Sequence, residues 1–259
     1  MFIEMRLVWL WVMLVLVSEC YGCLEKERIA LLQIKASIHN PNRNTVETWE
    51  EAWKGEATTD CCGWEGVKCN TKTGRVIQLS LIVEHIIYWR LEDRCLNVSM
   101  FLPFEELESL DLSNNGLQGC LENNEGFEKL ARLSNLQLLD LTGNSFNNSA
   151  NNLEGTINID ALKYLNNLEE LDFSSNRLDG FTPHSDFERL SVLSKLKVLT
   201  LAGNLFSHSI ISSLNAFPSL KTLDLSNNAI NGSIMEGKPN IKCLIITSRV
   251  WLGEAGIWS

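Results

Sequence analysis

The stretch Leu107-Glu-Ser-Leu-Asp-Leu-Ser-Asn-Asn-Gly-Leu-Gln-Gly119 holds the pattern from which the fold can be argued. Leu110 and Leu112 are two residues apart, so in a strand their side chains lie on one face and Asp111 lies on the opposite face. Asn115 follows three residues after Leu112. Its amide offers two donors and an acceptor, so a buried Asn115 can satisfy backbone groups of the turn that leaves the strand.

This pattern recurs along the chain at intervals that match or slightly exceed the period of a leucine-rich repeat. One repeat cannot bury its own leucine face, whereas stacked repeats share a continuous core. The copies begin at Leu107, Leu136, Leu168, Leu196 and Leu220. The asparagines that we expect to form a buried structural ladder are Asn115, Asn144, Asn176, Asn204 and Asn228. We therefore predict an α/β fold, a right-handed leucine-rich-repeat solenoid.

The pattern weakens at both ends of the array. Copies that begin at Val76 and Ile241 have Glu84 and Arg249 in the asparagine slot. We thus expect about seven repeats over residues 76–259, the last one degenerate. Residues 251–259 contain no cysteine pair or polar helix to cover an open leucine edge, which favours a chain that stops within a longer array.

The first residues predict the cellular compartment. Leu7 to Val17 is an unbroken apolar run that follows Arg6 and precedes small residues. As a helix this run rises only about 16 Å, roughly half of a bilayer core, so it indicates a signal peptide over residues 1–22 rather than an anchor. No later stretch reaches the length of a membrane span. We expect entry into the secretory pathway and a place outside the cell or at the plasma-membrane surface, where disulfides persist.

Residues 23–75 form a separate cysteine-bearing segment. Glu25 to Ile38 carries apolar residues at helical spacing, which predicts an amphipathic helix. Cys61 and Cys62 lack the spacing of a zinc site and have no histidine nearby, so disulfides are favoured over a metal. Adjacent cysteines can hardly bond to each other, so each is expected to pair elsewhere. We predict that this segment is a cap over the open core edge of the first repeat.

The segment resembles a known family. Residues 23–32, Trp49, residues 60–69 and residues 73–76 are similar to the amino-terminal cap of plant extracellular leucine-rich-repeat proteins. The sequence Leu-Asp-Leu-Ser-Asn-Asn at 110–115 and 223–228 resembles their receptor-like members.

The resemblance implies a fold and a function. It implies a disulfide-bonded cap, with the pairs Cys23–Cys61 and Cys62–Cys69. It implies an extracellular module of a cell-surface receptor in defence or developmental signalling, which binds a peptide, protein or carbohydrate ligand and signals through a partner receptor kinase. Such receptors carry more repeats, a carboxy-terminal cysteine cap and a membrane span, so a soluble inhibitor of secreted wall-degrading enzymes and a non-functional truncated product are the alternatives.

The strand geometry indicates where a ligand binds. Side chains between the leucines form the opposite face of the sheet, here called the inner face. Acidic residues dominate its first three strands and lysines appear in the last two, which suits a basic or mixed-charge partner; an ordinary solvated face is the alternative. The candidate ligand-binding residues are Glu108, Asp111, Ser113, Gln137, Asp140, Thr142, Glu169, Asp172, Ser174, Lys197, Thr200, Lys221, Asp224 and Ser226. The other inner-face positions are Ser109, Asn114, Leu138, Gly143, Glu170, Ser175, Val198, Ala202, Gly203, Thr222 and Asn227.

Two further sets of residues suit a secreted chain. Three Asn-x-Ser sequons predict glycosylation at Asn97, Asn147 and Asn231. Cys95 and Cys120 flank one repeat and are candidates to pair with each other, which leaves Cys243 without a partner.

Charge and motifs exclude several classes of function. The net charge of -10 disfavours nucleic acid and anionic lipid as partners. The four histidines share no motif, and the chain contains no nucleophile elbow, phosphate-binding loop, zinc-protease motif or kinase signature. We expect a protein that is not an enzyme and that needs no cofactor and no metal.

Overall fold

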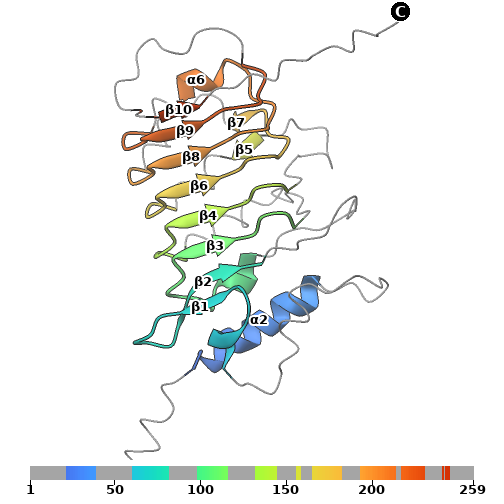
Figure 1. Cartoon of the computed structure of the whole chain (residues 1–259), viewed down its shortest axis with the longest axis vertical. Helices are drawn as coiled ribbons and strands as arrows, with labels where there is room; N and C mark the ends of the chain where they lie inside the picture. The colour runs from blue at the N-terminus through green and yellow to red at the C-terminus, as the bar shows by residue number, and fades with distance from the viewer. Residues whose placement is uncertain are drawn as a thin grey trace, which may run out of the picture.

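The computed structural model describes residues 22–38, 60–81, 98–115, 132–144, 156–158, 165–182, 193–213, 217–230, 241 and 243–245. An eight-stranded sheet runs through these residues in the order β1-β2-β3-β4-β6-β8-β9-β10. Figure 1 shows the strands stacked one above another, with helix α2 (Glu25–Ile38) at the β1 end of the stack. The helix has the bounds that its sequence pattern predicted.

The strands are short and follow the repeat. Their bounds are Val67–Cys69 for β1, Val76–Ser80 for β2, Ser109–Asp111 for β3, Leu138–Asp140 for β4, Glu170–Asp172 for β6, Val198–Thr200 for β8, Thr222–Asp224 for β9 and Cys243–Ile245 for β10. β1 is antiparallel to β2, and the strands from β2 to β10 are parallel to one another. Each parallel strand follows one of the repeat starts expected from the sequence, so the predicted leucine-rich-repeat solenoid is confirmed.

The core includes two aligned hydrophobic rows. The register places Leu110 beside Leu139, and the row continues through the neighbouring strands. None of its members from β2 to β9 is more than 3% exposed: Leu79, Leu110, Leu139, Leu171, Leu199 and Leu223. The second row is equally buried: Leu81, Leu112, Leu141, Phe173, Leu201 and Leu225. Because each leucine packs against those of adjacent repeats, the repeats stabilise one another.

The five predicted asparagines form a ladder of hydrogen bonds. Asn176 is typical, since its Nδ2 donates to the carbonyl of Leu141 in the preceding repeat (3.0 Å) and to that of Phe173 in its own repeat (3.0 Å). Each of the other four also donates to a carbonyl of its own repeat and to one of the preceding repeat. The ladder thus satisfies carbonyl groups where the chain leaves the sheet.

The residue before each ladder asparagine adopts a left-handed conformation, which the sequence analysis did not anticipate. The φ values are 56° at Asn114, 65° at Gly143, 55° at Ser175, 66° at Gly203 and 54° at Asn227. This backbone turn directs the N–H of Ser175 to the carbonyl of Ala202 in the next repeat (2.7 Å). Asparagine and glycine tolerate the left-handed region best, which suits four of the five residues found there.

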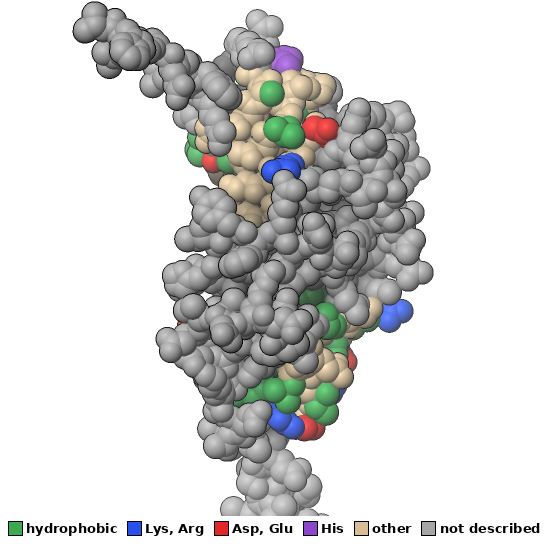
Figure 2. Space-filling model, turned by 90° about the vertical axis from the view of Figure 1, so that its right-hand side faces the viewer, with side chains coloured by type: hydrophobic (Ala, Val, Ile, Leu, Met, Phe, Trp, Pro, Cys, Tyr) green, Lys and Arg blue, Asp and Glu red, His purple; other side chains and the backbone are tan. Residues whose placement is uncertain are grey.

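Smaller elements lie outside the main sheet. β5 (Thr156–Asn158) pairs in parallel with β7 (Gly180–Thr182), and α6 (Ile210–Ser213) is a single helical turn. On the side shown in Figure 2, basic and acidic side chains lie close to one another at both ends of the stack. Within the described ranges no helix is long and apolar enough to cross a membrane.

Several sequence-based predictions lie outside the described residues. They are the signal peptide up to residue 21, Trp49, Glu84, Cys95, Asn97, Cys120, Asn147, Asn231, Arg249 and the final segment 251–259.

Candidate functional site

The amino-terminal cap is held by disulfides and by burial. Cys23 is bonded to Cys61 and Cys62 to Cys69, with 5.5 Å between the Cα atoms in each pair, and this is the pairing that the resemblance implied. The α2 side chains of Ala30, Leu31 and Ile34 are buried in the common core. Because β1 pairs along β2, the cap covers the first edge of the parallel sheet.

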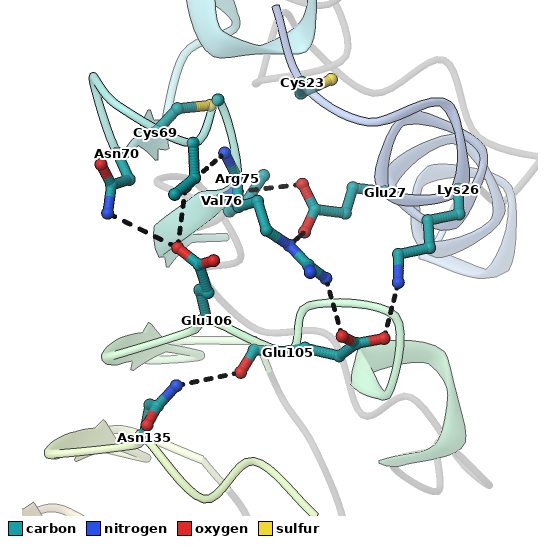
Figure 3. A network of polar contacts seen from close by, with 12 residues as sticks. Cys23, Lys26, Glu27, Cys69, Asn70, Arg75, Val76, Glu105, Glu106 and Asn135 are labelled. Carbon is teal, nitrogen blue, oxygen red and sulfur yellow. Dashed lines mark hydrogen bonds and ion pairs between the residues drawn. The ribbon is translucent and has the colours of Figure 1, made fainter. Parts of the chain in front are cut away.

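A polar network joins the cap to the first repeats (Figure 3). The carboxylate of Glu27 has no exposed surface and accepts hydrogen bonds from Arg75 Nε (3.3 Å) and the Val76 N–H (3.1 Å). Burial raises the pKa of Glu27, and the bonds from Val76 and Arg75 oppose that rise. Arg75 also contacts Glu105 at 3.1 Å, which in turn pairs with Lys26 at 2.6 Å.

The neighbouring Glu106 ties the β1–β2 loop to the same turn. Its carboxylate accepts a hydrogen bond from Thr73 Oγ1 at 2.8 Å and one from Asn70 Nδ2 at 3.5 Å. The charged groups of this network pair with one another and so hold the cap on the first repeats. The candidate ligand-binding residues lie on the sheet.

The inner face consists of three aligned rows of side chains. The first row, here called the leading row, contains Glu108, Gln137, Glu169, Lys197 and Lys221. The central row contains Ser109, Leu138, Glu170, Val198 and Thr222. The aspartate row contains Asp111, Asp140, Asp172, Thr200 and Asp224. All of these side chains are exposed or half-buried, so the face is open to a ligand in the described part of the chain.

The aspartate row is built from identical turns. Each aspartate accepts a hydrogen bond from the N–H two residues later, as Asp140 does from Thr142 at 2.8 Å. These bonds fix the carboxylates at the ends of β3, β4, β6 and β9. Parallel strands are about 4.8 Å apart, so Asp111, Asp140 and Asp172 on neighbouring strands carry like charges at short range.

The central carboxylate of the three is perturbed by its surroundings. Burial raises the pKa of Asp140, and the hydrogen bonds from Thr142 oppose the rise. The negative charges of Asp172 and Asp111 raise the pKa further. A cation placed over the three carboxylates would relieve this repulsion, because an opposite charge stabilises the ionised form.

Three candidate ligand-binding residues do not fit that role. Ser113, Ser174 and Ser226 are only 6%, 9% and 8% exposed, so their side chains offer almost no surface to a ligand. They come after the buried second-row residue, where the chain already turns away from the sheet, and their N–H groups serve the aspartate turns. This corrects the expectation that all polar positions between the leucines face a ligand.

Other features of the face were missed or undervalued in the sequence analysis. Leu138 and Val198 of the central row are partly exposed, although the candidate list held only polar residues. Lys197 is paired, since its Nζ lies 2.5 Å from Glu169 Oε2 on the adjacent strand.

A second set of asparagines also links the repeats. Asn135 donates to the carbonyl of Glu105 at 3.1 Å, and Asn167 donates to that of Ser134. Both asparagines immediately precede the first leucine of a repeat, and that position could have revealed a second link between repeats.

Two protein-family models match the chain. The leucine rich repeat N-terminal domain matches residues 24–70, and the leucine rich repeat matches residues 106–130, 167–190 and 219–239. Among solved structures, the Arabidopsis receptor kinase HAESA, in complex with the peptide hormone IDA and the co-receptor SERK1, is 25% identical with a TM-score of 0.56. That similarity covers 80% of this chain and 30% of HAESA. PEPR1, in its structure with AtPEP1, has the same fold, with a TM-score of 0.54 and 24% identity over 86% of this chain and 28% of PEPR1.

The fold, the cap and these matches define a leucine-rich-repeat protein. Receptor like protein 21 of Arabidopsis thaliana is 36% identical over 231 residues, which cover 81% of this chain and 23% of the relative. Receptor-like protein 13 of the same plant is 35% identical over 245 residues, covering 85% of this chain and 23% of the relative. The chain is a plant leucine-rich-repeat protein of the receptor-like type, and it spans about a quarter of the length of these relatives.

Proposed function

We propose that this chain is the extracellular ligand-recognition module of a plant cell-surface receptor-like protein that acts in defence or developmental signalling. It binds a peptide or protein ligand through the inner face, performs no catalysis, and passes the signal to a partner receptor kinase. The similarity to receptor-like proteins and to the HAESA ectodomain, whose structure holds a peptide hormone and a co-receptor, supports this proposal.

One contrast between buried and exposed rows carries the proposal. Along the first buried row, from Leu79 to Leu223, the residue is leucine on every strand from β2 to β9. Along the central row the residue changes from Ser109 to Leu138, Glu170, Val198 and Thr222. A constant core with a non-repeating exposed face gives a rigid platform with a specific pattern of contacts, as is usual for the binding surfaces of solenoid proteins.

The test uses glycans to block the inner face of the secreted full-length chain. Val198→Asn and Gln78→Asn each create an Asn-x-Ser/Thr sequon on the sheet, because Thr200 and Ser80 follow two residues later. Ser207→Asn is the matched control, since it creates a sequon with Ser209 at an exposed position beyond the ladder. Occupancy is verified by the mass shift on glycosidase treatment, and folding by the thermal transition.

A random-peptide display library is then selected on the immobilised wild-type chain. We expect selected peptides to bind the wild type and the Ser207→Asn variant and to lose binding to both inner-face variants. Failure to select any binder, or binding to the Val198→Asn and Gln78→Asn variants that is as tight as binding to the wild type, would refute recognition of peptides by this face.

A further inference from the structure

We propose that the inner face between β3 and β8 selects an extended peptide in which basic and apolar side chains alternate. This proposal rests on the proposed function and narrows it to a ligand chemistry. The basic side chains lie over the aspartate row, and the apolar side chains lie over Leu138 and Val198 of the central row.

The charge of the face determines which sign of charge the ligand carries. Its three rows contain seven acidic side chains, whereas the only basic ones are Lys197 and Lys221. One of these lysines is already paired with Glu169 on the adjacent strand. Asp111, Asp140 and Asp172 have no basic side chain in their own row or in the central row between β3 and β8. An anionic ligand would be repelled, and a cationic one would be attracted.

Apolar side chains on the same face indicate that the ligand carries apolar groups in addition to its positive charge. Leu138 on β4 and Val198 on β8 lie in one row, with Glu170 of β6 between them. Both are partly exposed on a face whose other side chains are mainly polar or charged. Burial of these side chains by a ligand would add an apolar contribution that a purely charged ligand cannot use.

The spacing of the two rows fits an extended backbone. Members of the central and aspartate rows are two residues apart on each strand, about 6.6 Å, so a peptide that runs across the strands can lie between the rows. Successive side chains of an extended peptide point in opposite directions. Odd residues therefore reach one row and even residues reach the other, which selects an alternating pattern.

The probe is a dye-labelled peptide, Arg-Leu-Arg-Leu-Arg, with three matched relatives. In one, citrulline replaces arginine and removes the charge at nearly constant shape; in another, serine replaces leucine; in the third, glutamate replaces arginine. Binding to the secreted full-length chain is followed by fluorescence anisotropy at two salt concentrations. We expect the parent peptide to bind, each substitution to weaken binding at least fivefold, and added salt to weaken the parent most.

Two isosteric variants place the site on the sheet. Asp140→Asn removes the central charge, and Asp224→Asn removes a charge from the same row next to Thr200, beyond the proposed site. Asparagine retains the oxygen that accepts the turn hydrogen bond, so both variants keep the local fold. We expect Asp140→Asn to weaken binding of the parent peptide about fivefold, and Asp224→Asn, one strand beyond the proposed site, to weaken it less than about twofold.

Three results would overturn the inference. They are equal binding of the arginine and citrulline peptides, equal effects of Asp140→Asn and Asp224→Asn, and binding of neutral cellohexaose without binding of the parent peptide. If the display selection succeeds on the inner face but yields peptides without basic residues, the inference fails while the proposed function stands. If the inner-face glycans do not block the selected peptides, the proposed function itself fails.

Discussion

Glu27 on α2 and Arg75, immediately before β2, form an ion pair across 48 residues of sequence, and the Glu27 carboxylate has no exposed surface. A buried charge that loses its partner destabilises a protein by several kcal/mol, so each side chain depends on the other. The Val76 N–H also donates to the same carboxylate. The pair therefore sets how the cap helix meets the first parallel strand.

Replacing Glu27 with alanine should destabilise the cap. Arg75 and the Val76 N–H would lose their buried acceptor, so we expect the free energy of unfolding to fall by about 3 kcal/mol. Denaturant unfolding of the secreted protein, followed by tryptophan fluorescence, measures the loss. The control is Glu25→Ala, which removes an exposed carboxylate that pairs with Arg28 one turn away on the same helix. A loss of the same size in both variants would show that the buried ion pair stabilises the protein no more than the exposed one does.

The two cap disulfides should contribute unequally. Cys23–Cys61 closes a separation of 38 residues and Cys62–Cys69 one of 7 residues. In the chain-entropy model, the disulfide that closes the longer loop stabilises the fold by about 4 kcal/mol, and the one that closes the shorter loop does so by about 2.4 kcal/mol. Replacement of both cysteines of each pair by serine should therefore lower the thermal midpoint more for the first pair. The reverse order in matched calorimetric scans would contradict this account.

The sequence predicted the repeated parts of the fold and much less of the unique parts. The leucine spacing recurs along the array, and an asparagine such as Asn176 occupies the same position in five repeats, so each copy supports the same interpretation. The Glu27–Arg75 pair occurs once and joins segments far apart in the chain, so no local pattern indicates it. Ser174 was misassigned because a polar residue two positions beyond an exposed one suggests the same face. The strand, however, ends at Asp172, and the backbone turns there.

Replacing Asn176 with alanine should break the ladder at its middle. The carbonyls of Leu141 and Phe173 would lose a buried donor, so we expect a loss of about 2–3 kcal/mol in the free energy of unfolding. Asn135→Ala is a suitable control, because Asn135 is exposed and donates one hydrogen bond to the carbonyl of Glu105. That control should cost less than about 1 kcal/mol. Equal costs in urea titrations would argue against a structural ladder.

Ser175 offers a stabilising substitution in the same turn. Its φ of 55° lies in the left-handed region, which costs a residue with a Cβ about 1 kcal/mol and costs glycine little. We expect Ser175→Gly to raise the midpoint of thermal unfolding by a few degrees. Ser194→Gly, at an exposed position without a positive φ, should have no such benefit. A lower midpoint for Ser175→Gly would mean that strain at this turn is not a significant cost.

Asp140 links the stability of the fold to its proposed ligand. Burial and the charges of Asp172 and Asp111 raise its pKa in the folded state, so the folded protein favours the protonated form more than the unfolded chain does. The stabilising contribution is thus complete below the unfolded pKa of about 3.9 and is lost as pH rises through the folded pKa.

Asp140→Asn should therefore have opposite effects on stability and on binding. At pH 7 we expect the variant to unfold with a free energy about 0.5–1 kcal/mol larger than the wild type, and at pH 3 the difference should disappear. Asp224→Asn should show no comparable gain, because its neighbours in the row, Thr200 and Ile245, carry no charge. Denaturant titrations at pH 3, 5 and 7 measure the difference. If the variant is less stable than the wild type at pH 7, the Asp140 carboxylate stabilises its own turn more than Asp111 and Asp172 destabilise it by repulsion. That result would remove the argument that an uncompensated negative charge on this face attracts a basic ligand.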